Sequence, residues 1–160
     1  MQVIRVRQAQ AEDFELVADF IRKLAEYERL LHEVRFDSET LRRHLFGERP
    51  AAEVLIGEVD GVPAGFALFF QTFSTFEGKP GIYLEDLFVE PAARGSGLGR
   101  ALLSGLAEQV VARGGARLEW AVLDWNELGK GFYRSIGAAP VDGWERWRVE
   151  GGALGRLAEG

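Results

Sequence analysis

A glycine-rich segment, RGSGLG at residues 94–99, has the residue types and spacing best suited to binding a ligand. It follows an apolar run, IYLEDLFVEP, and it opens a long amphipathic segment that begins at Leu98. Glycines let the backbone approach an anion closely, and the start of a helix presents unpaired N–H groups and the positive end of the helix dipole. Residues 82–113 are therefore predicted to form a strand, an anion-binding turn and a helix.

Two common phosphate-binding motifs do not match this segment. A dinucleotide-binding unit has Gly-x-Gly-x-x-Gly after the first strand of a parallel sheet and an acidic residue about 20 positions later. RGSGLG instead lies in the middle of the chain, behind a β-hairpin signal. The Walker motif requires Gly-Lys-Ser/Thr, which is missing here. A glycine turn that binds nothing is the structural alternative.

The composition is that of a globular protein, and it argues against several classes of function. A chain of 160 residues, 47% of them hydrophobic, is expected to form one domain over residues 1–160. Twenty-five acidic and nineteen basic residues give a net charge of −6, which argues against a nucleic-acid partner. Cysteine is absent and the only histidines are His32 and His44, so neither a thiol nucleophile nor a metal centre is expected. No signal peptide or membrane span is visible, and we expect a cytoplasmic protein.

Hydrophobic periodicity predicts an alternation of strands and helices along the chain. Alternating or continuous apolar runs predict strands at residues 3–7, 54–59, 62–70, 82–89, 117–123 and 144–149. Apolar residues at three- and four-residue spacing predict helices from residue 14, over 38–46, from 98 to about 113, and over 126–135, with a weakly helical tail from 151. Residues 71–81 carry Ser, Thr, two glycines and a proline and are expected to form a surface loop. This order is that of an α/β domain whose first half is largely antiparallel.

Turn and cap signals support this assignment. Asp60-Gly61 favours the positive φ angles of a tight hairpin turn between two strands. Asp37 or Ser38 can cap the helix over 38–46, and Gly47 can close it. The run GFALFF at residues 65–70 is apolar throughout, which is typical of a central strand covered by helices on both faces.

The order of these motifs resembles that of the GNAT acetyltransferase superfamily. The layout is a strand, Arg-x-x-Gly-x-Gly, a helix, a strand, an Asn, and a helix with Phe-Tyr; residues 94–99 match the acetyl-CoA pyrophosphate motif. LAEYE at 24–28, FGERP at 46–50, YLEDLFV at 83–89 and WN at 125–126 resemble the diamine (spermidine/spermine) and thialysine acetyltransferase branch. The resemblance covers nearly the whole chain. It implies the GNAT fold, a central mixed and mostly antiparallel sheet flanked by helices.

The resemblance also implies where acetyl-CoA binds. The end of the strand over 82–89 pairs with the pantetheine amides, the glycine turn holds the pyrophosphate, and the segment after Trp125 lines the cofactor arm. The implied cofactor-binding residues are Leu87, Phe88, Val89, Arg94, Gly95, Ser96, Gly97, Leu98, Gly99, Arg100, Asn126, Glu127, Leu128, Gly129 and Tyr133. With the other two phosphate motifs excluded, coenzyme A is the ligand that best suits the turn.

Two residues match the catalytic positions of the family. Tyr133 matches a general acid near the thioester sulfur, and Glu85 matches the carboxylate that deprotonates the amine, directly or through water. Such a base is needed because an alkylamine with a pKa near ~10.4 is almost wholly protonated at neutral pH. We expect the strand to bury Glu85, which would raise its pKa, while Asp86 would point to the opposite face of a regular strand. The structural alternatives are an acid paired with Arg for Glu85 and a core tyrosine for Tyr133.

A further set of residues falls at or near acceptor-contact positions of the family. These are Tyr27, Glu28, Glu85, Glu119, Trp120, Ala121 and Asp142. Because the acids near residue 28 alternate with Arg and Lys, a solvated helix face is the alternative interpretation. The four tryptophans are more often packing residues than substrate clamps.

We therefore expect an N-acetyltransferase that moves an acetyl group from acetyl-CoA to a primary amine of a small molecule, by direct attack in a ternary complex. The resemblance implies a polyamine, diamine or thialysine-like acceptor and a homodimer, with no metal. An acetyltransferase for an aminoglycoside or a protein lysine is one alternative. A CoA-binding module with little catalysis is the alternative from another class.

Overall fold

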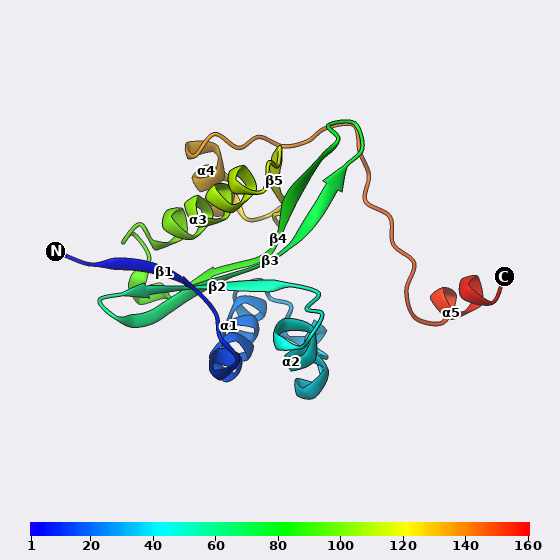
Figure 1. Cartoon of the computed structure of the whole chain (residues 1–160), viewed down its shortest axis with the longest axis horizontal. Helices are drawn as coiled ribbons and strands as arrows, with labels where there is room; N and C mark the ends of the chain where they lie inside the picture. Colours follow the sequence, from blue (N-terminus) through cyan, green and yellow to red (C-terminus); the bar gives the residue numbers. More distant parts are fainter. The chain divides into compact units, whose positions relative to one another are not determined.

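Five strands form one sheet in which spatial order follows chain order, β1-β2-β3-β4-β5 (Figure 1). Their bounds in the computed structural model are Ile4–Gln8 (β1), Glu53–Val59 (β2), Val62–Ser74 (β3), Lys79–Val89 (β4) and Arg117–Trp120 (β5). Neighbouring strands run antiparallel, except for β4 and β5, which run parallel. The prediction of an α/β fold with a mixed, mostly antiparallel sheet is confirmed.

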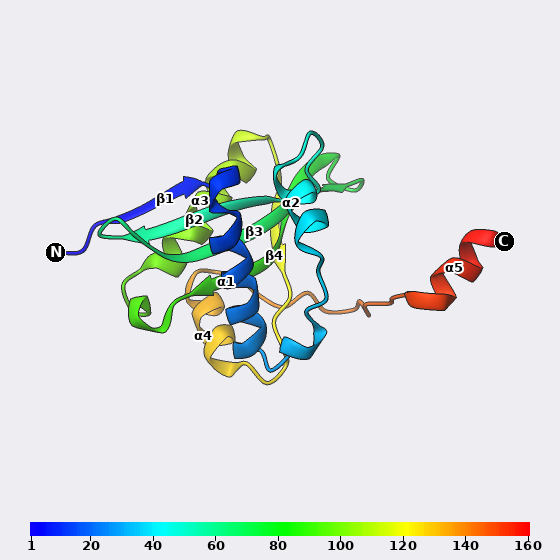
Figure 2. The same cartoon turned by 90° about the horizontal axis from the view of Figure 1, so that it is seen from below.

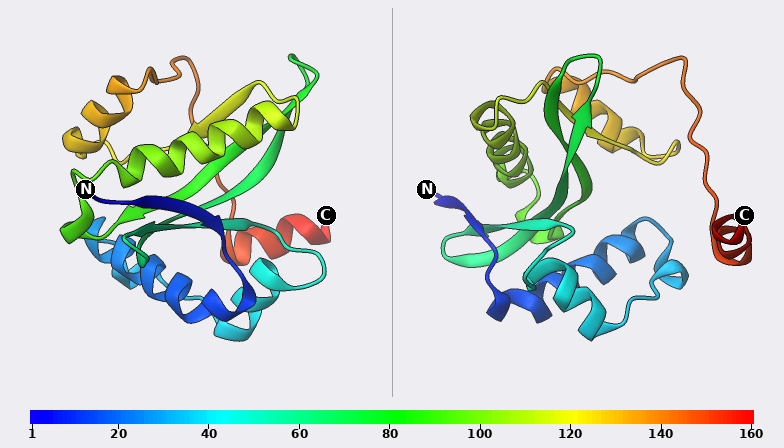
Figure 3. Two further views of the ribbon diagram at one scale, coloured as in Figure 1. Left: turned by 60° about the vertical axis from the view of Figure 1, so that its left-hand side comes forward. Right: turned by 45° about the vertical axis from the view of Figure 1, so that its right-hand side comes forward.

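The structure describes all residues from 1 to 160, in two compact units: residues 1–125, which contain the sheet, and residues 126–160. In the first unit, helices α1 (Phe14–Tyr27) and α2 (Ser38–Phe46) cover one face of the sheet, and α3 (Leu98–Ala112) covers the other (Figures 1 and 3). Helix α1 packs against β3 and β4 (Figure 2). No helix has the length and apolar character that crossing a bilayer requires.

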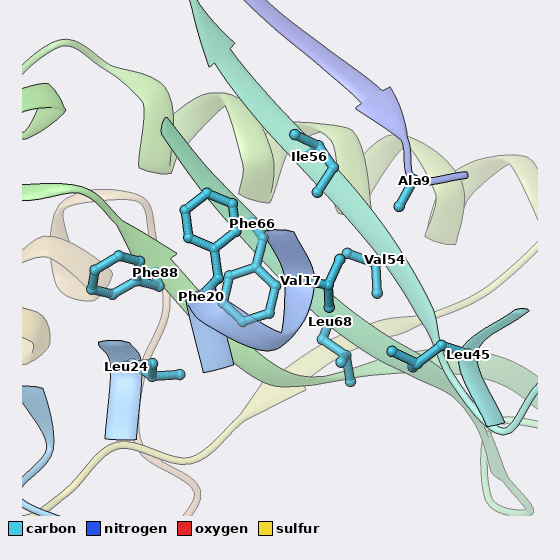
Figure 4. Packing of buried hydrophobic residues seen from close by; sticks show 10 residues of the cluster. All are labelled: Ala9, Val17, Phe20, Leu24, Leu45, Val54, Ile56, Phe66, Leu68 and Phe88. Carbon is cyan, nitrogen blue, oxygen red and sulfur yellow. The ribbon is translucent and has the colours of Figure 1, made fainter. Parts of the chain in front are cut away.

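Apolar residues of α1 and of the strands β2, β3 and β4 build the core between α1 and the sheet (Figure 4). Phe20 stacks on Phe66 of β3 with ring centroids 5.4 Å apart and contacts Phe88 of β4 at 6.0 Å. Phe20 and Phe66 are almost completely buried, as a central strand covered by helices requires. Phe88, the middle residue of the predicted cofactor stretch 87–89, is thereby fixed in the core.

The two β-hairpins show where local signals were sufficient and where they were not. Asp60 (φ 51°) and Gly61 (φ 81°) form the predicted tight turn between β2 and β3. The prediction of a surface loop over residues 71–81 is wrong, because β3 and β4 continue to the pair Ser74 and Lys79. Polar side chains do not prevent this pairing, because the bonds between strands come from the backbone. The turn itself occupies only residues 75–78, where Gly78 N–H donates to the Ser74 carbonyl at 2.8 Å.

A pair of glycines brings the start of α3 onto the sheet. Gly57 of β2 and Gly65 of β3 lie opposite each other. A Cβ atom on Gly57 would lie 2.6 Å from Leu98 Cδ1, and one on Gly65 would lie 2.6 Å from the Phe88 carbonyl oxygen. Leu98 is the first residue of α3 and is buried. The missing side chains therefore let the first turn of α3 pack directly on the strands.

The second unit contains two helices, α4 (Glu127–Ser135) and α5 (Gly151–Glu159), so the helices predicted over 126–135 and from 151 are confirmed. The strand predicted over 144–149 is not formed, because alternation creates a strand only where another strand supplies hydrogen bonds, and residues 126–160 contain none. Trp144 and Trp147 are exposed, at 80% and 86%. In the first unit, β5 ends at Trp120, three residues before the predicted Leu123.

Candidate active site

The glycine turn forms the start of α3, as predicted. Gly95 (φ 81°) and Gly97 (φ 93°) have backbone angles that favour glycine, and Gly97 is the residue before the first helical position. The N–H of Leu98 donates to Ser96 Oγ at 3.2 Å. The remaining N–H groups of a first helical turn have no partner within the helix, and the helix dipole is positive there. The turn therefore has the geometry of an anion site.

Strand β4 has an uncovered edge beside this turn. Its pairing with β5 covers only four residues and ends at the pair Leu84 and Trp120. From Leu87 to Val89, β4 continues to pair with β3 but with no strand on its other side. Backbone groups on that side can pair with the amides of an extended ligand, in the way that a peptide adds to a sheet edge. This is the stretch predicted to bind pantetheine.

A β-bulge lies where β4 and β5 part. Asp86 is opposite Leu68, whereas Leu84 is opposite Phe69, so Glu85 is the extra residue in β4. The prediction that the strand buries Glu85 is wrong, because the bulged residue is exposed. Asp86 is the partly buried carboxylate instead. The regular alternation that would have separated these two side chains does not hold at a bulge.

Three carboxylates interact electrostatically at this bulge. Burial, with smaller contributions from the charges of Glu85 and Glu28, raises the pKa of Asp86 to about 7. Burial, followed by the charge of Glu85, also raises the pKa of Glu28, which follows the last residue of α1. The three are not arranged to hold a metal ion. A carboxylate that titrates near pH 7 is suited to accept and release a proton under neutral conditions.

Aromatic and cationic side chains form a connected series at the end of α1. The Arg94 guanidinium carbon lies 5.0 Å from the centroid of the Tyr27 ring, and Arg94 Nε donates to the Val89 carbonyl at 3.2 Å. The Tyr27 and Trp125 ring centroids are 6.4 Å apart. The Arg29 guanidinium carbon lies 4.5 Å from the Trp125 ring centroid. The series links the predicted anion turn to the predicted acceptor residues.

The remaining predicted acceptor residues of the first unit lie at the end of β5. Glu119 pairs with Tyr83 and Trp120 with Leu84, one residue before the bulge, and both side chains are partly buried. Ala121 follows the strand and is exposed. The first unit thus brings Glu28, Glu85 and Asp86 together at the bulge, with the end of β5 beside it.

The other predicted site residues belong to the second unit, residues 126–160. Asn126 caps α4, because its Oδ1 accepts from the Gly129 N–H at 3.0 Å. Tyr133 is partly buried on α4, with its ring centroid 5.6 Å from that of Phe132. Asp142 is exposed in the segment between α4 and α5. The local structure of this unit therefore has the capped helix that the Asn-Phe-Tyr spacing predicts.

Three residues of the site were not assigned a role from the sequence. Asp86 lies within the YLEDLFV motif, but the bulge that partly buries it depends on pairing with β3 and leaves no local signal. Trp125 stands in the WN motif and is one of the four tryptophans expected to be packing residues. Arg29 had no signal beyond its position next to Glu28.

Comparison with known proteins identifies the family of this chain. The model of the acetyltransferase (GNAT) family matches residues 12–138. The chain belongs to the acetyltransferase (GNAT) family. A curated GNAT relative, thialysine N-epsilon-acetyltransferase of Bos taurus, is 36% identical over 169 residues, covering 99% of each chain. The spermidine/spermine N(1)-acetyltransferase-like protein 1 of Homo sapiens is 29% identical over 156 residues, covering 93% of this chain and 22% of that protein. A solved integron cassette protein from V. cholerae has a TM-score of 0.80 and 27% identity, with 98% of each chain covered.

Proposed function

We propose that this GNAT protein transfers an acetyl group from acetyl-CoA to a primary amine of a small molecule, by direct attack of the amine in a ternary complex. One observation carries the proposal. Strand β4 has a partly buried carboxylate at its bulge and an uncovered edge just beyond it, and this edge leads into the glycine turn at the start of α3. A proton acceptor and an anion site are thus a few residues apart on one continuous segment.

The residues present fit acetyl-CoA. A Cβ atom at Gly95 would meet nothing within 4 Å, so the turn is open to a phosphate, and Arg94 and Arg100 add positive charge. The backbone groups of the stretch Leu87, Phe88 and Val89 that face the uncovered edge are the proposed partners of the pantetheine amides. Acetyl-CoA, when bound there, supplies the activated acetyl group. The segment 126–129 and Tyr133 complete the proposed cofactor set.

Asp86 is the proposed proton acceptor. Its carboxylate takes a proton from the ammonium group of the acceptor, and the freed lone pair of the nitrogen forms the new bond to the acetyl carbonyl carbon. A pKa of about 7 leaves a substantial fraction of Asp86 ionised at neutral pH. Glu28 lies close enough to add negative charge that attracts the ammonium group. Glu85, exposed on the bulge, is the alternative acceptor of the proton, directly or through water.

Tyr133 is the proposed general acid. As the carbon–sulfur bond breaks, its hydroxyl donates a proton to the departing thiolate. A phenol hydroxyl is a proton donor suited to this step. The support is the position of Tyr133 on the Asn126-capped helix α4, which matches the family motif.

For the acceptor, we propose a diamine, a polyamine or a thialysine-like compound; in support, two curated relatives are named for thialysine and for spermidine/spermine. Tyr27, Glu28, Glu119, Trp120, Ala121 and Asp142 are its proposed contacts. We also propose that residues 1–160 act as one domain, since the family match crosses the boundary between residues 125 and 126. The homodimer implied by the family stays a prediction that light scattering can check.

Two measurements on the purified protein test this function. Saturating acetyl-CoA should raise the melting temperature of the wild type, since a ligand that binds only the folded state stabilises it. The rise in melting temperature should be smaller for Gly97→Ala. Alanine is strained at the φ of 93° found here, so this variant should distort the turn that binds the cofactor. Release of CoA thiol should then depend on an added amine, from a panel of polyamines, lysine analogues, aminoglycosides and a lysine peptide. A thermal shift with no thiol release from any amine would instead support a CoA-binding module.

A further inference from the structure

Arg29 has a backbone conformation that arginine rarely adopts. Only Arg29 (φ 62°) and Asp60 (φ 51°) have positive φ among the residues other than glycine, and the hairpin turn accounts for Asp60. Arg29 lies two residues after the last residue of α1 and caps this end of the helix. Its N–H donates to the Glu26 carbonyl at 3.1 Å, and the next N–H, of Leu30, donates to the Ala25 carbonyl at 2.8 Å. This pair of bonds is the Schellman motif, in which glycine usually occupies the left-handed position. The chain therefore places a guanidinium where glycine would be less strained.

The side chain of Arg29 lies at the candidate active site. Its guanidinium carbon is 4.5 Å from the centroid of the Trp125 ring, which in turn contacts the Tyr27 ring. Trp125 is 41% exposed, and Arg29 is exposed as well, so both are accessible to a small molecule. The Arg29 guanidinium makes no ion pair with a carboxylate of this chain. It is a cation held in place by an aromatic ring and open to an anion.

The charges around the site therefore have two signs. Glu28, Glu85 and Asp86 suit the ammonium group that is to be acetylated. Arg29, adjacent to Glu28 in the chain, suits a carboxylate, because a guanidinium binds carboxylates through paired hydrogen bonds. A diamine or polyamine has an ammonium group at the same place but no carboxylate beside it, so it offers Arg29 only a like charge. An acceptor with an amine at one end and a carboxylate at the other matches both signs.

We propose that Arg29 is a specificity-determining residue that binds the carboxylate of the acceptor, so that the enzyme selects an amino acid with a side-chain primary amine over the corresponding diamine. The inference rests on the proposed acetyl transfer and narrows its acceptor class. This role explains why a strained arginine occupies the left-handed position: a glycine there would end the helix equally well but would supply no cation.

The test compares acceptors that differ only by a carboxylate: L-lysine with 1,5-diaminopentane, and L-ornithine with 1,4-diaminobutane. For each, kcat/KM is measured from CoA thiol release for the wild type, Arg29→Gly, Arg29→Lys and Arg42→Gln. Arg42 is the matched control, because it is an exposed arginine with its guanidinium carbon 4.2 Å from the Phe14 ring centroid, in α2. Arg29→Gly relieves the backbone strain, so its melting temperature should equal or exceed that of the wild type.

The wild type should prefer the amino acid of each pair. Arg29→Gly should lower the ratio of kcat/KM for the amino acid to that for the diamine by about 10- to 100-fold, the discrimination that a charge-assisted hydrogen bond gives. The loss should lie mainly in KM for the amino acid, with Arg29→Lys intermediate and Arg42→Gln unchanged.

Two results would overturn the inference and leave acetyl transfer intact: an unchanged ratio in an active Arg29→Gly enzyme, or a wild type that prefers the diamines. A wild type that acetylates none of the amines, in this set or in the broader panel, would overturn the proposed function and the role of Arg29 with it.

Discussion

Replacing Asp86 with Asn removes the one carboxylate of the bulge whose pKa is raised to about 7. An aspartate ordinarily has a pKa of 3.8, so burial and the neighbouring charges favour the neutral form of Asp86 in the folded protein. At 1.36 kcal/mol per pH unit, this difference corresponds to roughly 4 kcal/mol. Because solvent still reaches part of the side chain, we expect the ionised form of Asp86 to destabilise the folded protein by about 2–3 kcal/mol.

The sign of this contribution follows from proton binding. Between about pH 4 and pH 7 the folded state binds a proton at Asp86 that the unfolded state has released, so the stability of the wild type falls as pH rises through this window. The penalty is absent below pH 4 and complete above pH 7. Asp86→Asn should therefore be about 2–3 kcal/mol more stable than the wild type at pH 8.5, and nearly equal to it at pH 4.

Urea denaturation at the two pH values measures this difference, and taking the variant relative to the wild type cancels the other titrating groups. Asp142→Asn, which removes an exposed carboxylate outside the bulge, is the control for the loss of one negative charge. If the difference in stability between Asp86→Asn and the wild type is the same at both pH values, burial does not raise the pKa of Asp86.

The same variant tests the proton acceptor. The wild-type kcat/KM should rise with an inflection near pH 7, and Asp86→Asn should lose this inflection together with about 10²- to 10⁴-fold in rate. Glu85→Gln, on the exposed bulge residue, should lose much less. The opposite ranking of the two variants would assign the proton transfer to Glu85.

Two further predictions concern the cofactor half of the site. Tyr133→Phe should lower kcat by about 10²- to 10⁴-fold with little loss of acetyl-CoA binding by calorimetry, and Tyr83→Phe is the control; unchanged turnover would remove Tyr133 from the mechanism. Gly65→Ala should lower the free energy of unfolding by about 2–3 kcal/mol, because its Cβ would lie 2.6 Å from the rigid Phe88 carbonyl oxygen. Gly131→Ala, whose Cβ meets nothing within 4 Å in α4, should not destabilise the protein, and equal urea midpoints for the two alanine variants would contradict this account.

Features that depend on a few neighbouring residues were predictable from the sequence. The Asp60-Gly61 turn, the helix that begins at Phe14 and the glycine turn before Leu98 all follow from local backbone preferences and apolar spacing. Residues 71–81 and 144–149 were assigned wrongly for one shared reason. Whether a segment pairs as a strand depends on a partner elsewhere in the chain, which local composition does not reveal.

The candidate site also combines residues that local sequence predicts with residues whose positions depend on distant parts of the chain. The anion turn is a local motif, so its residues could be named in advance. The exposure of Glu85 and the partial burial of Asp86 depend on a shift in register against β3, between Leu68 and Phe69. The position of Arg29 over Trp125 joins residues almost a hundred positions apart, so no spacing in the sequence could indicate it.

The uncovered edge of β4 also bears on the solubility of the protein. A free strand edge is a template on which an unrelated polypeptide can add a strand and begin aggregation. Here the edge is short, it begins at a bulge with two acidic residues, and the carbonyl of Val89 at its far end already accepts a hydrogen bond from Arg94. A regular β-strand from another chain would meet a kinked backbone that carries two acidic side chains. A flexible ligand with only two amides needs just the few backbone groups between the bulge and Val89. The irregularity that forms the site thus also protects the edge from self-association.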